Sequence, residues 1–129
     1  MRHGNTNRKF GRVRKVRSSF LKGLALDLIR HGKITTTEAR AKELKKVIEP
    51  LVTLAKKSDL PSRRLAVSRL MNRKEETKKL FDEIAPNYKS RRGGYTRITR
   101  LPVRKSDASR MAVIPSNPTV FVIFKRESR

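Results

Sequence analysis

The chain has 129 residues, of which 34 are lysine or arginine and 11 are aspartate or glutamate, so its formal net charge is +23. Because a small soluble domain usually carries a net charge of only about 2 to 8, self-repulsion at this charge predicts a polyanionic partner that neutralises it. The absence of cysteine excludes disulfides, thiolate zinc sites and thiol catalysis.

The first predicted element is a basic N-terminal arm, residues 1–15. It is polar and has no apolar pattern, so it cannot bury enough apolar area to offset the entropy of ordering its backbone. We expect it to be disordered alone and to become ordered on its partner. It lacks the apolar run of a secretory signal, whereas its arginine-rich, acid-free composition also resembles a mitochondrial transit peptide, which remains an alternative.

Two helices are predicted after the arm. Apolar residues at positions 20, 21, 24, 25, 28 and 29 follow the spacing of an amphipathic helix that starts near Val16 and is capped by Gly32. Thr35 and Glu38 have the spacing of a capping box, which predicts the start of a second helix. Its apolar face continues to about Lys57.

Shorter helices are expected next. Pro61 favours the first turn of a third helix that runs to Leu70. Asn72 and Glu75 form a possible capping pair for a fourth. Pro86 is expected to end the helical part of the chain.

The last third of the chain has the pattern of short strands. The predicted strands are Tyr95–Leu101, Met111–Ile114 and Thr119–Lys125, with Lys33–Thr35 as a candidate edge strand. The apolar run 120–124 is read as a buried strand, with an edge that binds a partner protein as the alternative. Helices followed by strands predict an α+β fold, with amphipathic helices packed on one face of a small, mostly antiparallel sheet. We expect a single domain over residues 16–129.

The positive charge is concentrated in two segments. Residues 1–26 contain eight bases and no acid, and residues 84–110 contain eight bases and one acid, so together they carry +15 of the +23. In the middle of the chain, acids and bases are interleaved at helical spacing, such as Glu38 with Lys42 and Asp82 with Lys78. Those middle charges are expected to be solvated helix surface.

Catalytic and metal sites find little support in the sequence. The two histidines lie in the arm and at the predicted C-terminus of the first helix, where His31 favours the helix dipole. Adjacent carboxylates, such as Glu75 and Glu76, diverge on a helix. Gly93 and Gly94 are not followed by the lysine and hydroxyl residue of a phosphate-binding P-loop. We therefore expect no enzyme activity, no cofactor and no small-molecule substrate.

The stretch 91–97 combines two arginines, two glycines, a tyrosine and a further arginine. Arginine binds phosphate bidentately, and glycine lets the backbone approach a phosphate closely. Tyr95 has two readings of equal weight, which are RNA contact, by stacking on an exposed base or hydrogen-bonding a 2′-hydroxyl, and packing in the core. Regular alternation would place Arg97 and Arg100 on opposite faces of a strand. In the following loop, Asp107 is expected to bind its own backbone or a neighbouring arginine.

An RNA partner is favoured over DNA. A DNA-groove reader usually presents a recognition helix with base-reading side chains on one face, whereas the excess charge here lies in an arm and a loop–strand region. Arms and loops suit irregular RNA folds, which are recognised by shape and phosphate position. A DNA-compacting protein and a cationic protein of the membrane surface remain as alternatives, although the polar arm without tryptophan disfavours the second.

Several motifs together resemble a known family. They are His31, Ile34, Thr36-Thr37, Ala41–Leu44, Glu49–Leu51, Thr53–Lys56, Arg92–Ile98 and Met111-Ala112, after the start Met1–His3 and Arg8-Lys9. This pattern, which runs in order from residue 1 to about 114, resembles the bacterial large-subunit ribosomal protein seventeen family. The chain departs from the family pattern at Arg14–Arg17, at Ser106 and after Ile114.

The resemblance implies a structural component of the large ribosomal subunit. Such a protein binds large-subunit ribosomal RNA near the exit of the nascent-chain tunnel, beside neighbouring large-subunit ribosomal proteins, and acts in translation in the cytoplasm. An organellar ribosome is the alternative. The residues expected to contact RNA are Arg2, His3, Arg8, Lys9, Arg12, Arg14, Lys15, Arg17, Arg91, Arg92, Gly93, Gly94, Tyr95, Arg97, Arg100, Arg104, Lys105 and Arg110.

Overall fold

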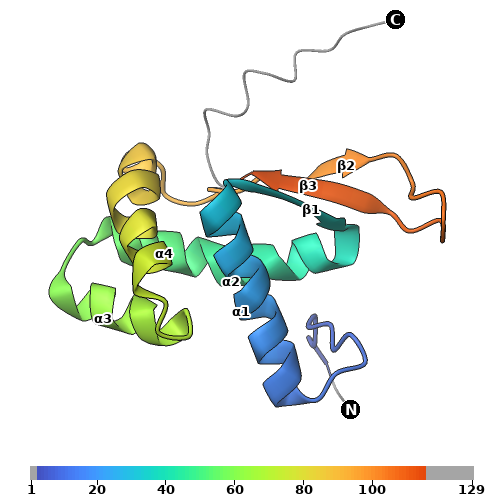
Figure 1. Ribbon diagram of the computed structural model, residues 1–129, viewed down its shortest axis with the longest axis horizontal. Helices are drawn as coiled ribbons and strands as arrows, with labels where there is room; N and C mark the ends of the chain where they lie inside the picture. The colour runs from blue at the N-terminus through green and yellow to red at the C-terminus, as the bar shows by residue number, and fades with distance from the viewer. Residues whose placement is uncertain (1–2, 116–129) are drawn as a thin grey trace, which may run out of the picture.

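The computed structural model describes residues 3–115 (Figure 1). Arg2 and the predicted strand Thr119–Lys125 lie outside the described residues, so the expectations for them stay predictions.

Two long helices form the centre of the molecule. Helix α1 (Arg14–His31) ends at Gly32, whose left-handed backbone (φ 75°) confirms the predicted cap. Helix α2 (Glu38–Lys56) crosses it and lies beneath the sheet (Figure 1). Because α1 begins at Arg14, the first helical turn includes two residues that were assigned to the arm.

Shorter helical elements follow α2. Helix α3 (Leu60–Arg69) starts at Asp59, which caps it by accepting a hydrogen bond from the Ser62 amide at 3.3 Å. Helix α4 (Lys74–Lys79) continues without a break into a π-helical turn (Leu80–Ile84) and a 3₁₀ turn (Ala85–Tyr88). In Figure 1, α3 and α4 lie together at one end of the molecule.

Three antiparallel strands form the sheet, in the order β1-β3-β2. Strand β3 (Met111–Pro115) pairs with β1 (Lys33–Thr37) along its whole length and with the short β2 (Thr99–Leu101) at one end. The helices pack on one face of this sheet (Figure 1), which confirms the predicted α+β fold.

The core lies between the sheet and the helices. Ala112 and Ile114 alternate with half-buried neighbours along β3, so one face of the strand is directed inward. They belong to one buried cluster with apolar residues of the helices, of which the largest fully buried ones are Leu28, Ile29, Leu44, Ile48, Leu70, Leu80 and Tyr88.

Both predicted capping pairs are wrong. Thr35 lies inside β1, where it pairs with Val113, and the residue before α2 is Thr37, whose side chain makes no capping bond. Strand pairing over the whole of β1 outweighs one local side-chain bond. Asn72 has a left-handed backbone (φ 59°) rather than the extended conformation of an N-cap, and α4 starts after Arg73.

Two predicted boundaries also differ. The helical part continues past Pro86 to Tyr88, because Pro86 falls in the first turn of a new 3₁₀ segment, where its missing N–H is not needed. The predicted strand from Tyr95 is regular only from Thr99, because Thr96 bonds to α2 instead of to a strand. Its hydroxyl and amide both donate to Glu49 Oε1, at 3.0 and 3.4 Å.

Candidate nucleic-acid interface

The arm is attached to α1 by an aromatic cluster. The Phe10 ring meets the Phe20 ring edge to face, with centroids 6.0 Å apart. The Arg12 guanidinium lies 4.4 Å from the centroid of the Phe20 ring, and Arg40 lies 5.3 Å from it. Arg17 donates to the Arg12 carbonyl at 3.2 Å. Arg12 and Arg17 therefore brace the arm, while each retains further N–H donors.

The arm also contacts α2. Arg8 lies 3.8 Å from the carboxylate of Glu43, which is buried, and Lys46 donates to the Thr6 carbonyl at 3.3 Å. His3 and Lys9 are exposed. The sequence predicted a basic arm but no specific contacts with the body.

The arm and the β2–β3 hairpin (residues 99–115) meet beside the start of α2. Arg8 of the arm, Lys42 of α2 and Arg110 of the hairpin line one hollow of about 330 Å³. Arg8 and Arg110, which come from the two segments with most of the excess charge, thus border the same hollow although 102 positions separate them in the sequence. We call the basic surface around this hollow the arm–hairpin surface. It consists of residues 3–12, Lys42, Lys46 and residues 100–110.

Glu38 organises this surface. Its buried carboxylate lies 2.9 Å from Lys42 Nζ and 3.3 Å from the guanidinium of Arg100. The hydrogen bond from Lys42, together with the charge of Arg100, lowers the pKa of Glu38 below its ordinary value. The carboxylate therefore stays ionised and holds Lys42 at the edge of this hollow and Arg100 at the edge of an adjacent one that Glu38 and Arg110 also line.

The tip of the hairpin is closed by its own ion pair. Arg104 binds both carboxylate oxygens of Asp107, at 2.9 and 2.6 Å, and the Ser109 amide donates to the same group at 3.2 Å. The hydrogen bonds from Arg104 hold the pKa of Asp107 well below its usual range. This confirms that Asp107 binds its own loop, and it leaves Lys105 and Arg110 exposed on either side.

Other acids in the middle of the chain are also paired within the protein. Buried Glu76 accepts from Arg30 at 2.6 Å, and Asp82 pairs with Arg63 of α3 at 3.3 Å rather than with the predicted Lys78. Lys42 is exposed on α2 and pairs with Glu38, as predicted, and it also borders the hollow between the arm and the hairpin, which its sequence position did not indicate.

A second basic site lies at the other end of α2. Arg91, Gly94, Tyr95, Thr96 and Arg97 line a hollow of about 330 Å³, and Arg92 beside it is exposed. Gly94 has a left-handed backbone (φ 62°), and a Cβ added to it or to Gly93 would meet no atom of the described residues within 4 Å. The glycines therefore leave the backbone of this glycine loop (residues 91–97) open to a close ligand.

Tyr95 packs in the core, so the base-stacking reading is wrong for this conformation. The residue is only 4% exposed, and its ring meets the Tyr88 ring edge to face at 5.3 Å between centroids. Its hydroxyl accepts from Lys56 Nζ at 3.1 Å and donates to the Arg91 carbonyl at 3.4 Å. Tyr95 thus positions the glycine loop instead of offering a ring to a base.

The structure separates the glycine loop from the arm–hairpin surface. The 19 residues of α2, at about 1.5 Å per residue, make a helix roughly 28 Å long. Glu38 is at its hairpin end, and Lys56, which also donates to the Arg91 carbonyl, is at its loop end. Arg97 is not in a strand, so the expected alternation with Arg100 does not apply. Arg14 and Lys15 are exposed in the first turn of α1.

Within residues 3–115, no cluster of three or more side chains suited to a metal ion occurs. In the same part of the chain, every helix is too short or too polar to cross a membrane.

Comparison with known proteins identifies the family. The profile described as ribosomal protein L17 matches residues 20–115. The chain is 50% identical over 115 residues to "Large ribosomal subunit protein bL17" of Desulfovibrio desulfuricans, covering 88% of this chain and 67% of that one. It is also 50% identical over 114 residues to the protein of the same name from Helicobacter hepaticus, covering 88% and 97%. This chain belongs to the ribosomal protein L17 family.

The family assignment confirms the resemblance seen in the sequence. The L17 match starts inside α1 and ends with β3, so it includes the glycine loop and the β2–β3 hairpin. The arm lies before the residues that the family profile matches, so its role is inferred from its contacts with α1 and α2.

Proposed function

We propose that this L17-family chain is a structural component of the large ribosomal subunit that binds and stabilises large-subunit ribosomal RNA and so contributes to translation. The observation that carries the proposal is the convergence of the arm and the hairpin on one basic surface around a buried, ionised Glu38. Membership of the L17 family supports the large ribosomal subunit as the assembly, and the geometry of the arm and hairpin supports this surface as the RNA-binding one.

Recognition at the arm–hairpin surface rests on phosphate position. The acidic side chains close to this surface are already paired with lysine or arginine side chains of the protein itself, so their charges are neutralised. Further exposed lysine and arginine donors remain for RNA. Because the donors come from the arm, α2 and the hairpin, they fit phosphates of a folded RNA better than one straight backbone. The sequence-distant origin of the donors makes folding of the protein a condition for binding.

The glycine loop forms a second contact at the far end of α2. There, Gly94 lines a hollow together with Arg91 and Arg97, the backbone of Gly93 and Gly94 is open, and Arg92 is exposed beside it. A protein that holds RNA at both ends of a helix roughly 28 Å long can link two RNA segments. This is an architectural role, and we propose no catalytic one.

The family resemblance also supports a place for the protein near the exit of the nascent-chain tunnel, beside neighbouring large-subunit ribosomal proteins. The bacterial relatives favour a cytoplasmic ribosome, with an organellar one as the alternative.

Salt dependence of RNA binding tests the proposal. If the full chain neutralises six to ten phosphates, its affinity for a large-subunit RNA fragment falls by about 10³ to 10⁵ between 50 and 200 mM salt. The double variant Arg8→Ala/Arg110→Ala should reduce the slope of log affinity against log salt by about 1.4 to 1.8 if both residues bind phosphates. Lys57→Ala/Arg69→Ala removes the same charge from two exposed positions outside both surfaces and is the matched control.

Equal slopes for the two double variants would show that net charge, not the arm–hairpin surface, governs binding. Preference for duplex DNA over the RNA fragment in direct competition would favour the DNA-compacting alternative. In cells, deletion of residues 1–12 should leave the body folded and weaken incorporation into large subunits. Normal incorporation of the truncated chain would reject the role of the arm.

A further inference from the structure

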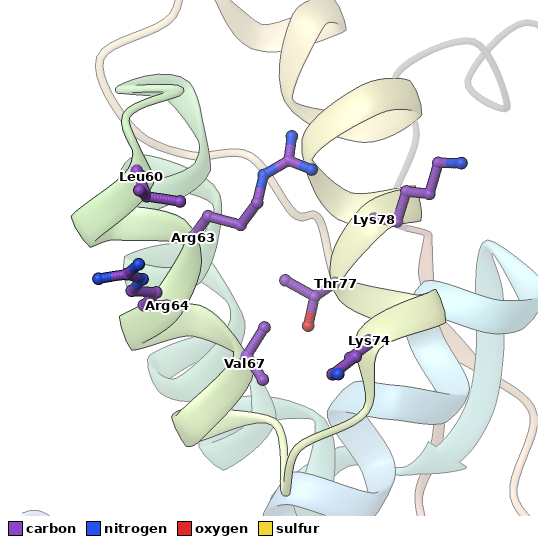
Figure 2. Close-up of a pocket in the computed structure, with 7 residues that line it drawn as sticks. All are labelled: Leu60, Arg63, Arg64, Val67, Lys74, Thr77 and Lys78. Atoms are coloured by element: carbon purple, nitrogen blue, oxygen red, sulfur yellow. The ribbon is translucent and has the colours of Figure 1, made fainter.

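A groove lies between α3 and α4, apart from both basic surfaces. Leu60, Arg63, Arg64 and Val67 of α3 form one side, and Lys74, Thr77 and Lys78 of α4 form the other, around a space of about 460 Å³ (Figure 2). Figure 1 places these helices at the end of the molecule opposite the β2–β3 hairpin.

The floor of the groove is apolar. Leu60 is 59% exposed, and Val67 is half-buried and faces Thr77 across the groove (Figure 2). The Thr77 hydroxyl donates to the Arg73 carbonyl at 2.7 Å, so the side chain presents its methyl group to the groove. Covering an apolar floor with an exposed leucine at its edge removes apolar area from water, which favours binding of a partner there.

The rim of the groove is entirely basic. The lining residues include four bases and no acid. Arg63 is engaged, because it pairs with Asp82 at 3.3 Å and lies 5.0 Å from the centroid of the Phe81 ring. Among residues 3–115, Arg64, Lys74 and Lys78 have no ion-pair partner. Three unpaired cations around an apolar floor favour an occupant that carries both carboxylates and apolar side chains.

Other occupants fit less well. RNA would satisfy the cations but gains nothing from Leu60 and Val67, and the lining offers no aromatic ring on which a base could stack. A second copy of a chain with a charge of +23 is repelled. Residues 116–129 contain an apolar run, but three bases against one acid give them the wrong charge for this rim.

We propose that the groove between α3 and α4 binds an acidic amphipathic helix of a partner protein. Apolar side chains spaced three and four residues apart on that helix cover Leu60 and Val67, while its flanking carboxylates pair with Arg64, Lys74 and Lys78. This goes beyond the proposed RNA binding and does not depend on it, because it uses none of the same residues.

A titration with a defined probe tests the groove. The probe is a synthetic acidic peptide of about 20 residues with leucines at helical spacing, and a scrambled peptide of identical composition controls for bulk charge. At about 150 mM salt, exposed charges are largely screened beyond about 8 Å. Under these conditions the full chain should bind the peptide with leucines at helical spacing at least tenfold more tightly than the scrambled peptide. Equal affinity for both peptides would overturn the proposal.

Matched variants on α3 locate the binding site. Leu60→Ser should weaken peptide binding roughly tenfold, because burial of a leucine is worth about that factor. Leu65→Ser changes a leucine of the same helix that is 43% exposed but does not line the groove, and it should have no effect. In the same way, Arg64→Glu should weaken binding and Arg69→Glu should not. Losses of equal size within either pair would overturn the proposal.

Crosslinking in assembled subunits identifies the occupant. A photoreactive amino acid in place of Leu60 in the full chain should crosslink to an acidic, apolar-patterned segment of another protein. Crosslinks to RNA or to residues 116–129, or none, would overturn the proposal. Because the peptide titration needs no ribosome, failure of RNA binding and failure of the groove are distinguishable.

Discussion

Removal of the Tyr95 hydroxyl should destabilise the protein without removing an RNA contact. Tyr95 is 4% exposed, and its hydroxyl joins Lys56 on α2 to the Arg91 carbonyl in the glycine loop. Tyr95→Phe keeps the ring and its contact with Tyr88. The variant thus isolates the hydrogen bonds.

The magnitude follows from those bonds. The bond from Lys56 at 3.1 Å is charge-assisted, and a bond of that kind is worth about 1.5–3 kcal/mol. Lys56 keeps its bond to the Arg91 carbonyl, and the bonds to Thr53 and Arg91 are long at 3.4 Å, so the loss is nearer the lower limit. We expect Tyr95→Phe to lower the free energy of unfolding by about 1–2 kcal/mol. For a chain of this size the melting temperature should fall by about 4 °C per kcal/mol.

Urea unfolding followed by circular dichroism measures this loss. Thr53→Ala is the control, since it removes the long bond to the Tyr95 hydroxyl and a local bond to the Glu49 carbonyl from an exposed side chain but leaves the bond from Lys56 to Tyr95 intact. The same samples are then titrated with RNA under folded conditions. Tyr95→Phe and Tyr95→Leu both remove the hydroxyl that positions the glycine loop, and only Tyr95→Leu also lacks the ring, so the RNA affinities of the two folded variants should agree within threefold. An affinity at least tenfold weaker for Tyr95→Leu than for Tyr95→Phe, which stacking on a base would produce, or an unchanged stability of Tyr95→Phe, would refute the core role.

Three further changes test separate parts of the structure. The pKa of Glu38 is lowered in the folded state, so its stabilising contribution is present above about pH 4.5 and is lost as the pH falls through the folded value. The urea midpoint of Glu38→Gln should therefore fall less between pH 7 and pH 3 than that of the parent chain, and parallel falls would contradict this. Gly94→Ala should cost about 1–2 kcal/mol in urea unfolding because of its left-handed backbone, and a neutral effect would show that the loop relaxes freely. Phe20→Leu should speed tryptic cleavage at Arg8 and Lys9 while the body stays protected, since Phe20 anchors the arm. Unchanged cleavage would mean that other contacts hold the arm.

Local patterns predicted the parts of the fold that depend on neighbours in the sequence. Gly32 caps α1, Asp107 closes its own loop, and Met111 begins a strand, as the pattern of nearby residues indicates. The capping box at Thr35 failed because a distant partner competed for the residue. Thr35 is taken by Val113, a residue 78 positions away that no local rule can see.

The candidate site was predictable in its charge and not in its arrangement. The sequence located the basic segments, but it could not show that α2 keeps the glycine loop away from the hairpin while Arg8 meets Arg110. Tyr95 illustrates the limit most clearly, because a tyrosine beside two glycines has the same local pattern whether its ring is buried or exposed. Burial is decided by Tyr88 and Lys56, which come from other elements.

The middle of the chain, residues 27–83, carries fifteen bases against nine acids, and the fold gives these bases different tasks. Arg30 neutralises buried Glu76, Lys42 joins the arm–hairpin surface, and Arg64 and Lys78 border the groove. Each of these basic residues contributes equally to the net charge, but they lie at different places in the fold. Removing one of them should therefore affect stability, RNA binding or partner binding according to its location. The net charge therefore predicts that a polyanion binds, and the pairing of the acids decides which surface remains to bind it.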